Sequence, residues 1–208
     1  MSHFSDIENS FSVYEAPKNG GTTLRLWIFF AGTGEVIKSS ESAYYTGNSR
    51  THTLLKEWGY HNGYFQNTET EERVCIKRDP VKRFVSCFHD KVMKEGRLQA
   101  TVDELLDDFE RILDQSPSKL NDGKTNFMKF HFDPQTTHFG KDYSYYTHVF
   151  DTTEVSTKLK DYLENKWQIE LPDLHARNSG SKPKFELTSK QIDKIKEIYS
   201  DDYNTGWA

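Results

Sequence analysis

A glycine turn that contains a lysine separates an apolar run from a helical segment near the start of the chain. Residues 11–14 (Phe-Ser-Val-Tyr) predict a strand, and residues 24–30 (Leu-Arg-Leu-Trp-Ile-Phe-Phe) predict a helix. At such a junction, the N–H groups of the turn and the positive end of the helix dipole attract an anion. Gly20 and Gly21 allow the backbone to approach that anion closely. The segment therefore predicts an α/β fold with a phosphate-binding turn.

The turn differs from the Walker A loop of kinases and ATPases. That loop ends in Gly-Lys-Ser/Thr, and its hydroxyl group binds Mg²⁺. Here Lys18 precedes the glycines and lies next to the expected strand end. A P-loop-type nucleotide or small-molecule kinase stays an alternative, because the strand-turn-helix architecture is shared. An ordinary connection with a surface lysine is another.

A second strand-to-helix junction follows about sixty residues later. Residues 74–76 (Val-Cys-Ile) predict a buried parallel strand. Asp79 is a suitable N-cap and Pro80 a suitable first helical residue, so a helix is expected from there to about residue 95. Arg78 at the strand end and Ser86 two turns along the helix can then converge on one anion.

Both junctions match motifs of one enzyme family. Pro-Lys-x-Gly-x-Thr at 17–22 resembles the 5′-phosphosulfate loop of sulfotransferases that use 3′-phosphoadenosine 5′-phosphosulfate (PAPS). Arg-Asp-Pro-x-x-Arg-x-x-Ser at 78–86 resembles the pattern by which these enzymes hold the 3′-phosphate. The polar loop at 171–183 and the His-Phe-Asp-Pro-Gln segment at 131–135 resemble the carbohydrate sulfotransferases, and the absence of a visible anchor suggests a soluble bacterial or viral type.

The resemblance implies a fold and a set of cofactor-binding residues. The expected fold is a P-loop-like three-layer α/β structure, with a central parallel sheet, helices on both faces and the ligand at the carboxyl ends of the strands. Lys18 would bind the bridging oxygen and the 5′-phosphate, and Arg78 and Ser86 would bind the 3′-phosphate. The full expected set is Lys18, Asn19, Gly20, Gly21, Thr22, Thr23, Arg78, Ser86, Arg177, Asn178, Ser179 and Lys182.

The resemblance also implies in-line sulfuryl transfer to a hydroxyl acceptor, without a metal, leaving 3′,5′-ADP. A base must remove the acceptor proton; His61 is the first candidate and His131 the second. His52, Glu41 and Glu57 are the alternatives. Gln135 and Tyr64 are candidate substrate-binding residues. A glycan is the expected acceptor, with tyrosine, a small alcohol or a lipid-linked sugar as alternatives. Arg83 is expected either to support the anion site indirectly or to form a surface ion pair.

Length, charge and cysteine content bear on the number of domains, the location of the protein and its partners. The 208 residues suit one domain, 1–208, with 1–10 as a loosely held tail. We expect a cytoplasmic protein without a membrane partner, because no signal peptide or long apolar run is visible. The net charge of −5 argues against a general nucleic-acid binder. Cys75 and Cys87 are expected to be buried thiols, and no metal-ligand spacing is present. A non-catalytic nucleotide-binding module is the alternative from another functional class; the oligomeric state stays open.

The other expected elements follow from caps and periodicity. Gly32 to Gly34 should end the first helix, and Thr101 with Glu104 predicts a capping box at the start of a further helix. The remaining expectations are a strand at 35–38, a short helix at 51–58, a polar loop at 114–130, a strand at 146–150, and helices at 153–166 and 188–199.

Overall fold

The computed structural model describes residues 2–36, 54–55, 57–62, 69–117, 119, 125–174 and 185–208. The chain divides into two compact units. Unit 1 comprises Met1–Lys77 and Ser144–Ser179, and unit 2 comprises Arg78–Tyr143 and Gly180–Ala208. Each unit has its own hydrophobic core. Among the described helices, none is both long enough and apolar enough to cross a membrane.

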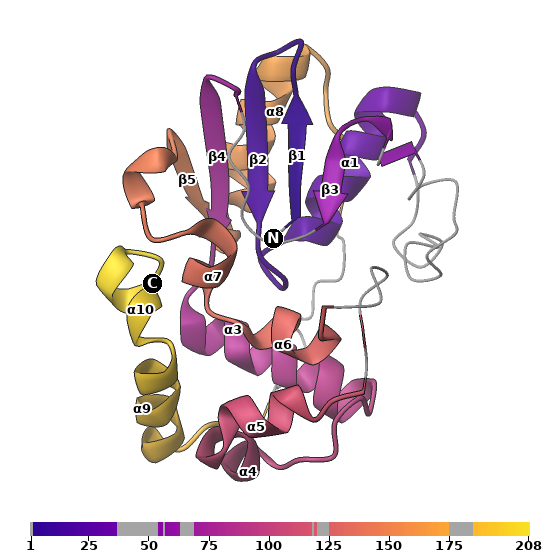
Figure 1. The fold of residues 1–208 in the computed structure, drawn as a ribbon. Helices are drawn as coiled ribbons and strands as arrows, with labels where there is room; N and C mark the ends of the chain where they lie inside the picture. The colour runs from indigo at the N-terminus through magenta and orange to yellow at the C-terminus, as the bar shows by residue number, and fades with distance from the viewer. Residues whose placement is uncertain are drawn as a thin grey trace. The chain divides into compact units, whose positions relative to one another are not determined.

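Unit 1 is built on a five-stranded sheet with the order β3-β1-β2-β4-β5 (Figure 1). Its strands are β1 (Ser2–Asp6), β2 (Phe11–Glu15), β3 (Tyr60–Asn62), β4 (Glu72–Lys77) and β5 (His148–Asp151). Strands β2, β4 and β5 are parallel, whereas β1 pairs antiparallel with both β2 and β3. The predicted α/β class is confirmed, but the sheet is mixed, because a short turn joins β1 directly to β2 and such a hairpin is antiparallel.

The expectation of a loose tail over residues 1–10 is wrong, because residues 2–6 form strand β1. Phe4 is 5% exposed, and its ring makes edge contacts with Phe11 and Trp167. Strand β1 has the sequence Ser-His-Phe-Ser-Asp, in which Phe4 is the one large apolar residue. The strand therefore has no hydrophobic pattern of its own and forms through its backbone pairing with β2 and β3.

Helices α1 (Gly21–Thr33) and α8 (Lys160–Trp167) pack against one face of this sheet. Phe11 and Val13 of β2 share a buried cluster with Leu24 and Trp27 of α1 and Leu163 of α8. Helix α1 ends where the sequence predicted. Its C-cap, Gly34, has φ 71° and donates its N–H to the carbonyl of Phe30. Helix α8 follows β5 through the 3₁₀-helix η4 (Thr152–Glu154) and the π-helix η5 (Val155–Leu159).

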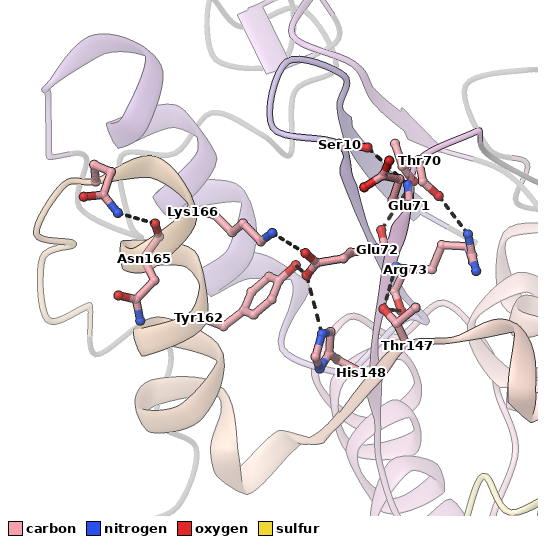
Figure 2. Close-up of polar contacts among 11 residues, drawn as sticks. Ser10, Thr70, Glu71, Glu72, Arg73, Thr147, His148, Tyr162, Asn165 and Lys166 are labelled. Carbon is pink, nitrogen blue, oxygen red and sulfur yellow. Dashed lines mark hydrogen bonds and ion pairs between the residues drawn. The ribbon is translucent and has the colours of Figure 1, made fainter.

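A polar cluster fastens α8 to the amino ends of β4 and β5 (Figure 2). The hydroxyl of Tyr162 donates to Glu72 at 2.7 Å, and Lys166 forms an ion pair with the same carboxylate. Nε2 of His148 lies 3.4 Å from it. Hydrogen bonds from Lys166 and Tyr162 lower the pKa of Glu72. The cluster lies at the amino ends of β4 and β5, away from the carboxyl ends of β2 and β4. We therefore assign it a structural role, the attachment of α8 to the sheet.

Unit 2 is helical in the part that the structure describes. Its elements are α3 (Pro80–Cys87), which continues as the π-helix η2 (Phe88–Lys94), α4 (Val102–Asp107), α5 (Phe109–Asp114), α6 (Phe127–Phe132), α7 (Gln135–Phe139), α9 (Ser189–Ile198) and α10 (Ser200–Thr205). The turn η3 (Tyr143–Tyr145) precedes β5. The helix predicted over 79–95 is confirmed. The helix predicted after Thr101 breaks at Asp108, which has φ −143°, and the loop predicted over 114–130 contains the start of α6.

Candidate functional site

The turn between β2 and α1 is tight and has two residues in the left-handed region. Lys18 has φ 72° and Gly20 has φ 86°. The N–H of Asn19 donates to the carbonyl of Ala16 at 3.1 Å, which closes the turn. A residue with a side chain is uncommon at positive φ and costs roughly 1 kcal/mol there. The half-buried lysine is therefore held in a conformation that its own backbone disfavours.

The side chain of Asn19 ties this turn to the neighbouring strand. Asn19 is fully buried, and its Nδ2 donates to the carbonyl of Ile76 near the end of β4 at 2.8 Å. From the sequence, Asn19 is expected only as one of the cofactor-binding residues. The side-chain bond fixes the turn at the carboxyl end of the parallel strands, where ligands bind in open α/β sheets.

Gly21 is required by a buried carboxylate that sequence reasoning missed. A Cβ atom at Gly21 would lie 1.2 Å from Oε2 of Glu15. Glu15 is 3% exposed and forms an ion pair with Arg25 of α1. The sequence signal was an acidic residue two positions before Pro17, at the end of a mostly apolar strand.

Helix α1 begins at this turn with a glycine as its N-cap. Within the described residues, the N-cap position supplies no side-chain hydrogen bond to the first turn of α1. Thr22 and Thr23 are half-buried there, and the N–H of Thr23 donates to the carbonyl of Gly20 at 3.0 Å. The donors of a helix start, two hydroxyls and a lysine form a set that fits the phosphate group of a nucleotide.

Unit 2 contains the second predicted motif. The Asp79 carboxylate accepts from the N–H of Lys82 at 2.8 Å and Pro80 opens α3, which confirms the predicted cap. Arg78 is half-buried between β4 and α3, and Ser86, in α3, is 8% exposed. A guanidinium and a hydroxyl are suitable donors to a second phosphate.

Arg83 does not form the surface ion pair that was one of its two expected roles. It is 1% exposed, and its guanidinium donates to the carbonyls of Asp133 at 2.7 Å and His131 at 3.0 Å. It therefore holds the segment between α6 and α7. That segment leads directly into Gln135, the first residue of α7.

Gln135 contacts the backbone of Arg78. Its Oε1 accepts from the N–H of Arg78 at 2.9 Å, and its Nε2 donates to the carbonyl of Arg78 at 2.7 Å. Nε2 also donates to the carbonyl of Trp207 at 2.9 Å. The residue is fully buried. The structure thus gives Gln135 a protein partner that the sequence did not predict.

The two base candidates differ in what the structure describes of them. His61 lies in β3, and its backbone is paired with His3 of β1; its side chain lies outside the described residues. His131 lies in α6, with Nδ1 2.7 Å from the carbonyl of Phe127. Because a carbonyl only accepts, Nδ1 carries the proton and Nε2 is the acceptor atom in the neutral ring. That tautomer suits a proton acceptor.

Several predicted residues lie outside the described part of the chain. They are Tyr64, Arg177, Asn178, Ser179 and Lys182, together with the alternative bases His52 and Glu41. Glu57, the remaining alternative, is exposed. Cys75 and Cys87 are buried thiols that form no disulfide, and burial raises the pKa of Cys75. Among the described residues, no group of three or more His, Cys, Asp or Glu side chains could hold a metal ion.

Comparison with known proteins agrees with the motif analysis at the level of the family. A search of the curated proteins found no match. The model of the sulfotransferase family matches residues 8–205, which include the segments 17–22 and 78–86 and nearly all of the 208 residues. The chain belongs to the sulfotransferase family.

Proposed function

We propose that this protein transfers the sulfuryl group of PAPS to a hydroxyl group of an acceptor, with a carbohydrate as the acceptor class. The observation that supports this most is the turn before α1, where Lys18 and Gly20 both have positive φ at the start of a helix with a glycine N-cap. PAPS would supply the sulfuryl group and leave as 3′,5′-ADP.

The turn would bind the 5′-phosphate end of the donor. The backbone N–H groups of Gly20, Gly21 and Thr22, with the hydroxyls of Thr22 and Thr23, would donate to the phosphate oxygens. The N–H groups of Asn19 and Thr23 instead donate to the carbonyls of Ala16 and Gly20 and so shape the turn. Lys18 would stabilise the negative charge that develops on the bridging oxygen as the sulfuryl group leaves. With this cation and the helix dipole at the leaving group, the proposed mechanism needs no metal.

The 3′-phosphate would distinguish PAPS from ordinary nucleotides. Arg78 and Ser86 are the proposed donors to it, and a bidentate guanidinium contact suits a phosphate. The remaining proposed contacts come from the loop that carries Arg177, Asn178, Ser179 and Lys182, as the family resemblance implies.

A histidine would take the proton of the acceptor hydroxyl as the new O–S bond forms. We propose His61 or His131 for this role, and Tyr64 as an acceptor contact. The Nδ1 hydrogen bond of His131 leaves Nε2 in the form that accepts a proton. Variants His61→Ala and His131→Ala would separate the two candidates by which one loses turnover at unchanged donor affinity.

The test is transfer from radiolabelled PAPS to oligosaccharides, tyrosine peptides and small alcohols. We expect Lys18→Ala to lower kcat at least about 100-fold, the usual loss of one donor to a developing charge. Arg78→Ala should raise KM for PAPS about tenfold or more. Lys158→Ala, which removes an exposed lysine of unit 1 paired with Glu154, is the matched control and should change neither constant.

A thermal-shift measurement checks the donor independently of the acceptor. We expect 3′,5′-ADP to raise the melting temperature in the presence of EDTA. Stabilisation by Mg-ATP alone, with phosphoryl rather than sulfuryl transfer, would show a kinase instead. Binding of 3′,5′-ADP without transfer to any acceptor class would show a non-catalytic module.

A further inference from the structure

We propose that Gln135 is a positioning residue for the donor's 3′-phosphate, which sets the direction of the Arg78 side chain by holding the backbone on both sides of its Cα atom. The inference rests on the proposed function, because it assumes that Arg78 contacts this phosphate. All of the residues involved belong to unit 2.

The hydrogen bonds of Gln135 fix both peptide groups that flank the Cα atom of Arg78. Oε1 accepts from the Arg78 N–H at 2.9 Å, and Nε2 donates to the Arg78 carbonyl at 2.7 Å. Arg78 lies between β4 and α3, outside both elements. A carboxamide supplies both an acceptor and donors, which a carboxylate or an ammonium group does not.

The C-terminal segment holds both the backbone and the carboxamide of Gln135 in place. The carboxylate of Asp202, which is fully buried, accepts from the N–H groups of Gln135 at 2.9 Å and Thr136 at 2.8 Å. The carbonyl of Trp207 accepts from Nε2 of Gln135 at 2.9 Å. Trp207 is also fully buried, and its indole N–H donates to the carbonyl of Gly140 at 3.1 Å.

Through the side chain of Gln135, this arrangement connects α10 and Trp207 to Arg78, the proposed hydrogen-bond donor to the 3′-phosphate. An arginine binds a phosphate well only when its planar fork has the right direction. Because Cα–Cβ direction follows from the backbone, a fixed backbone at Arg78 reduces the conformational freedom lost when phosphate binds. Gln135 therefore acts on 3′-phosphate affinity without touching the ligand.

The test compares two nucleotides by calorimetry, 3′,5′-ADP and 5′-AMP, which lacks the 3′-phosphate. In Gln135→Ala, we expect the affinity for 3′,5′-ADP to fall about tenfold, as for the loss of one or two hydrogen bonds. The affinity for 5′-AMP should stay within about twofold. If Gln135→Ala does not fold, Gln135→Glu keeps the shape and removes both bonds to carbonyls, and the same selective loss is expected.

Asn126→Ala is the matched control for a general loss of structure. The Asn126 side chain also forms two hydrogen bonds with the backbone of unit 2. It accepts from the Lys129 N–H at 3.0 Å and donates to the Leu113 carbonyl at 2.8 Å. Its removal should lower the melting temperature without changing the ratio of the two dissociation constants. Equal losses for both nucleotides in the Gln135 variants would overturn the inference.

A double-mutant cycle separates this inference from the proposed function. In an Arg78→Ala background, Gln135→Ala should cause no further loss of 3′,5′-ADP affinity, because the side chain to be positioned is gone. A full further loss would overturn the positioning role. An Arg78→Ala variant that binds 3′,5′-ADP normally would instead refute the proposed 3′-phosphate site, and the inference with it.

Discussion

Helices α1 and α9 differ in whether a side chain accepts hydrogen bonds from the first N–H groups of the helix. At α9, the Thr188 hydroxyl accepts from the Gln191 N–H at 3.3 Å, and the Gln191 side chain accepts from the Thr188 N–H at 2.9 Å. This is a complete capping box, and α4 has the same arrangement. In the described structure, the N-cap of α1 is Gly20, which offers no side-chain acceptor.

The difference separates a helix start that serves stability from one that is suited to bind a ligand. A capping box uses the chain's own oxygen atoms to satisfy the first N–H groups of the helix. A glycine at φ 86° loses that stabilisation but brings the backbone close to an incoming anion. Substitutions at the start of α1 test whether it is suited to bind an anion.

The largest effect is expected for Gly21→Ala. Glycine-to-alanine changes inside helices usually stabilise by about 0.5–1 kcal/mol. Here the new Cβ atom would meet the buried Glu15 carboxylate at 1.2 Å, so we expect a net destabilisation of about 1–3 kcal/mol in urea unfolding. In a Glu15→Ala background the cost should shrink, because the obstructing carboxylate is gone. Equal costs in both backgrounds would contradict this explanation.

Gly20→Ala should destabilise by about 1–2 kcal/mol, the cost of a side chain at left-handed φ. Its Cβ atom would also lie 3.2 Å from Cγ2 of Val155. We expect a weaker affinity for 3′,5′-ADP as well, because the turn can no longer approach the phosphate. Urea unfolding and calorimetry measure the two effects.

Two control variants sharpen this prediction at the other helix ends. Gly34→Ala also places a side chain at positive φ, at the C-terminal end of α1, where no described atom lies within 4 Å of the new Cβ. Thr188→Ala removes the α9 cap at a cost of about 1 kcal/mol. Both should lower stability and leave nucleotide affinity unchanged. A loss of affinity in either control would mean that stability alone explains the Gly20 result.

The smallest effect is expected from acid. Hydrogen bonds from Thr101 lower the pKa of Glu104 in the α4 capping box, so its contribution is present above the unfolded-state pKa and is lost as pH falls through the lower folded value. The α9 box uses Gln191, which does not titrate. Amide exchange should therefore show protection factors near Thr101 that fall with acid before those near Thr188. Parallel loss at both helix starts would contradict this role of Glu104.

Much of the local structure was predictable because its causes are short-range. Asp79 and Pro80 started α3, Gly34 ended α1, and Thr101 capped α4 as predicted. A cap and its partner lie three residues apart, so the sequence shows both. By contrast, strand β1 could not be predicted, since so polar a segment is stabilised by its pairing with β2 and β3, which are separate segments of the chain.

The sequence alone determined the two sulfotransferase-like motifs at 17–22 and 78–86, their order along the chain and the strand-to-helix junctions that carry them, because these depend on residues next to one another. Only the tertiary structure decided the long-range partners: Asn19 with the Ile76 carbonyl, Glu15 against Gly21, and Gln135 with the backbone of Arg78. Gln135 and Arg78 are 57 positions apart in the chain. Such pairs form because buried polar groups must find hydrogen-bond partners, and the folded chain, rather than any local pattern, determines which groups are near.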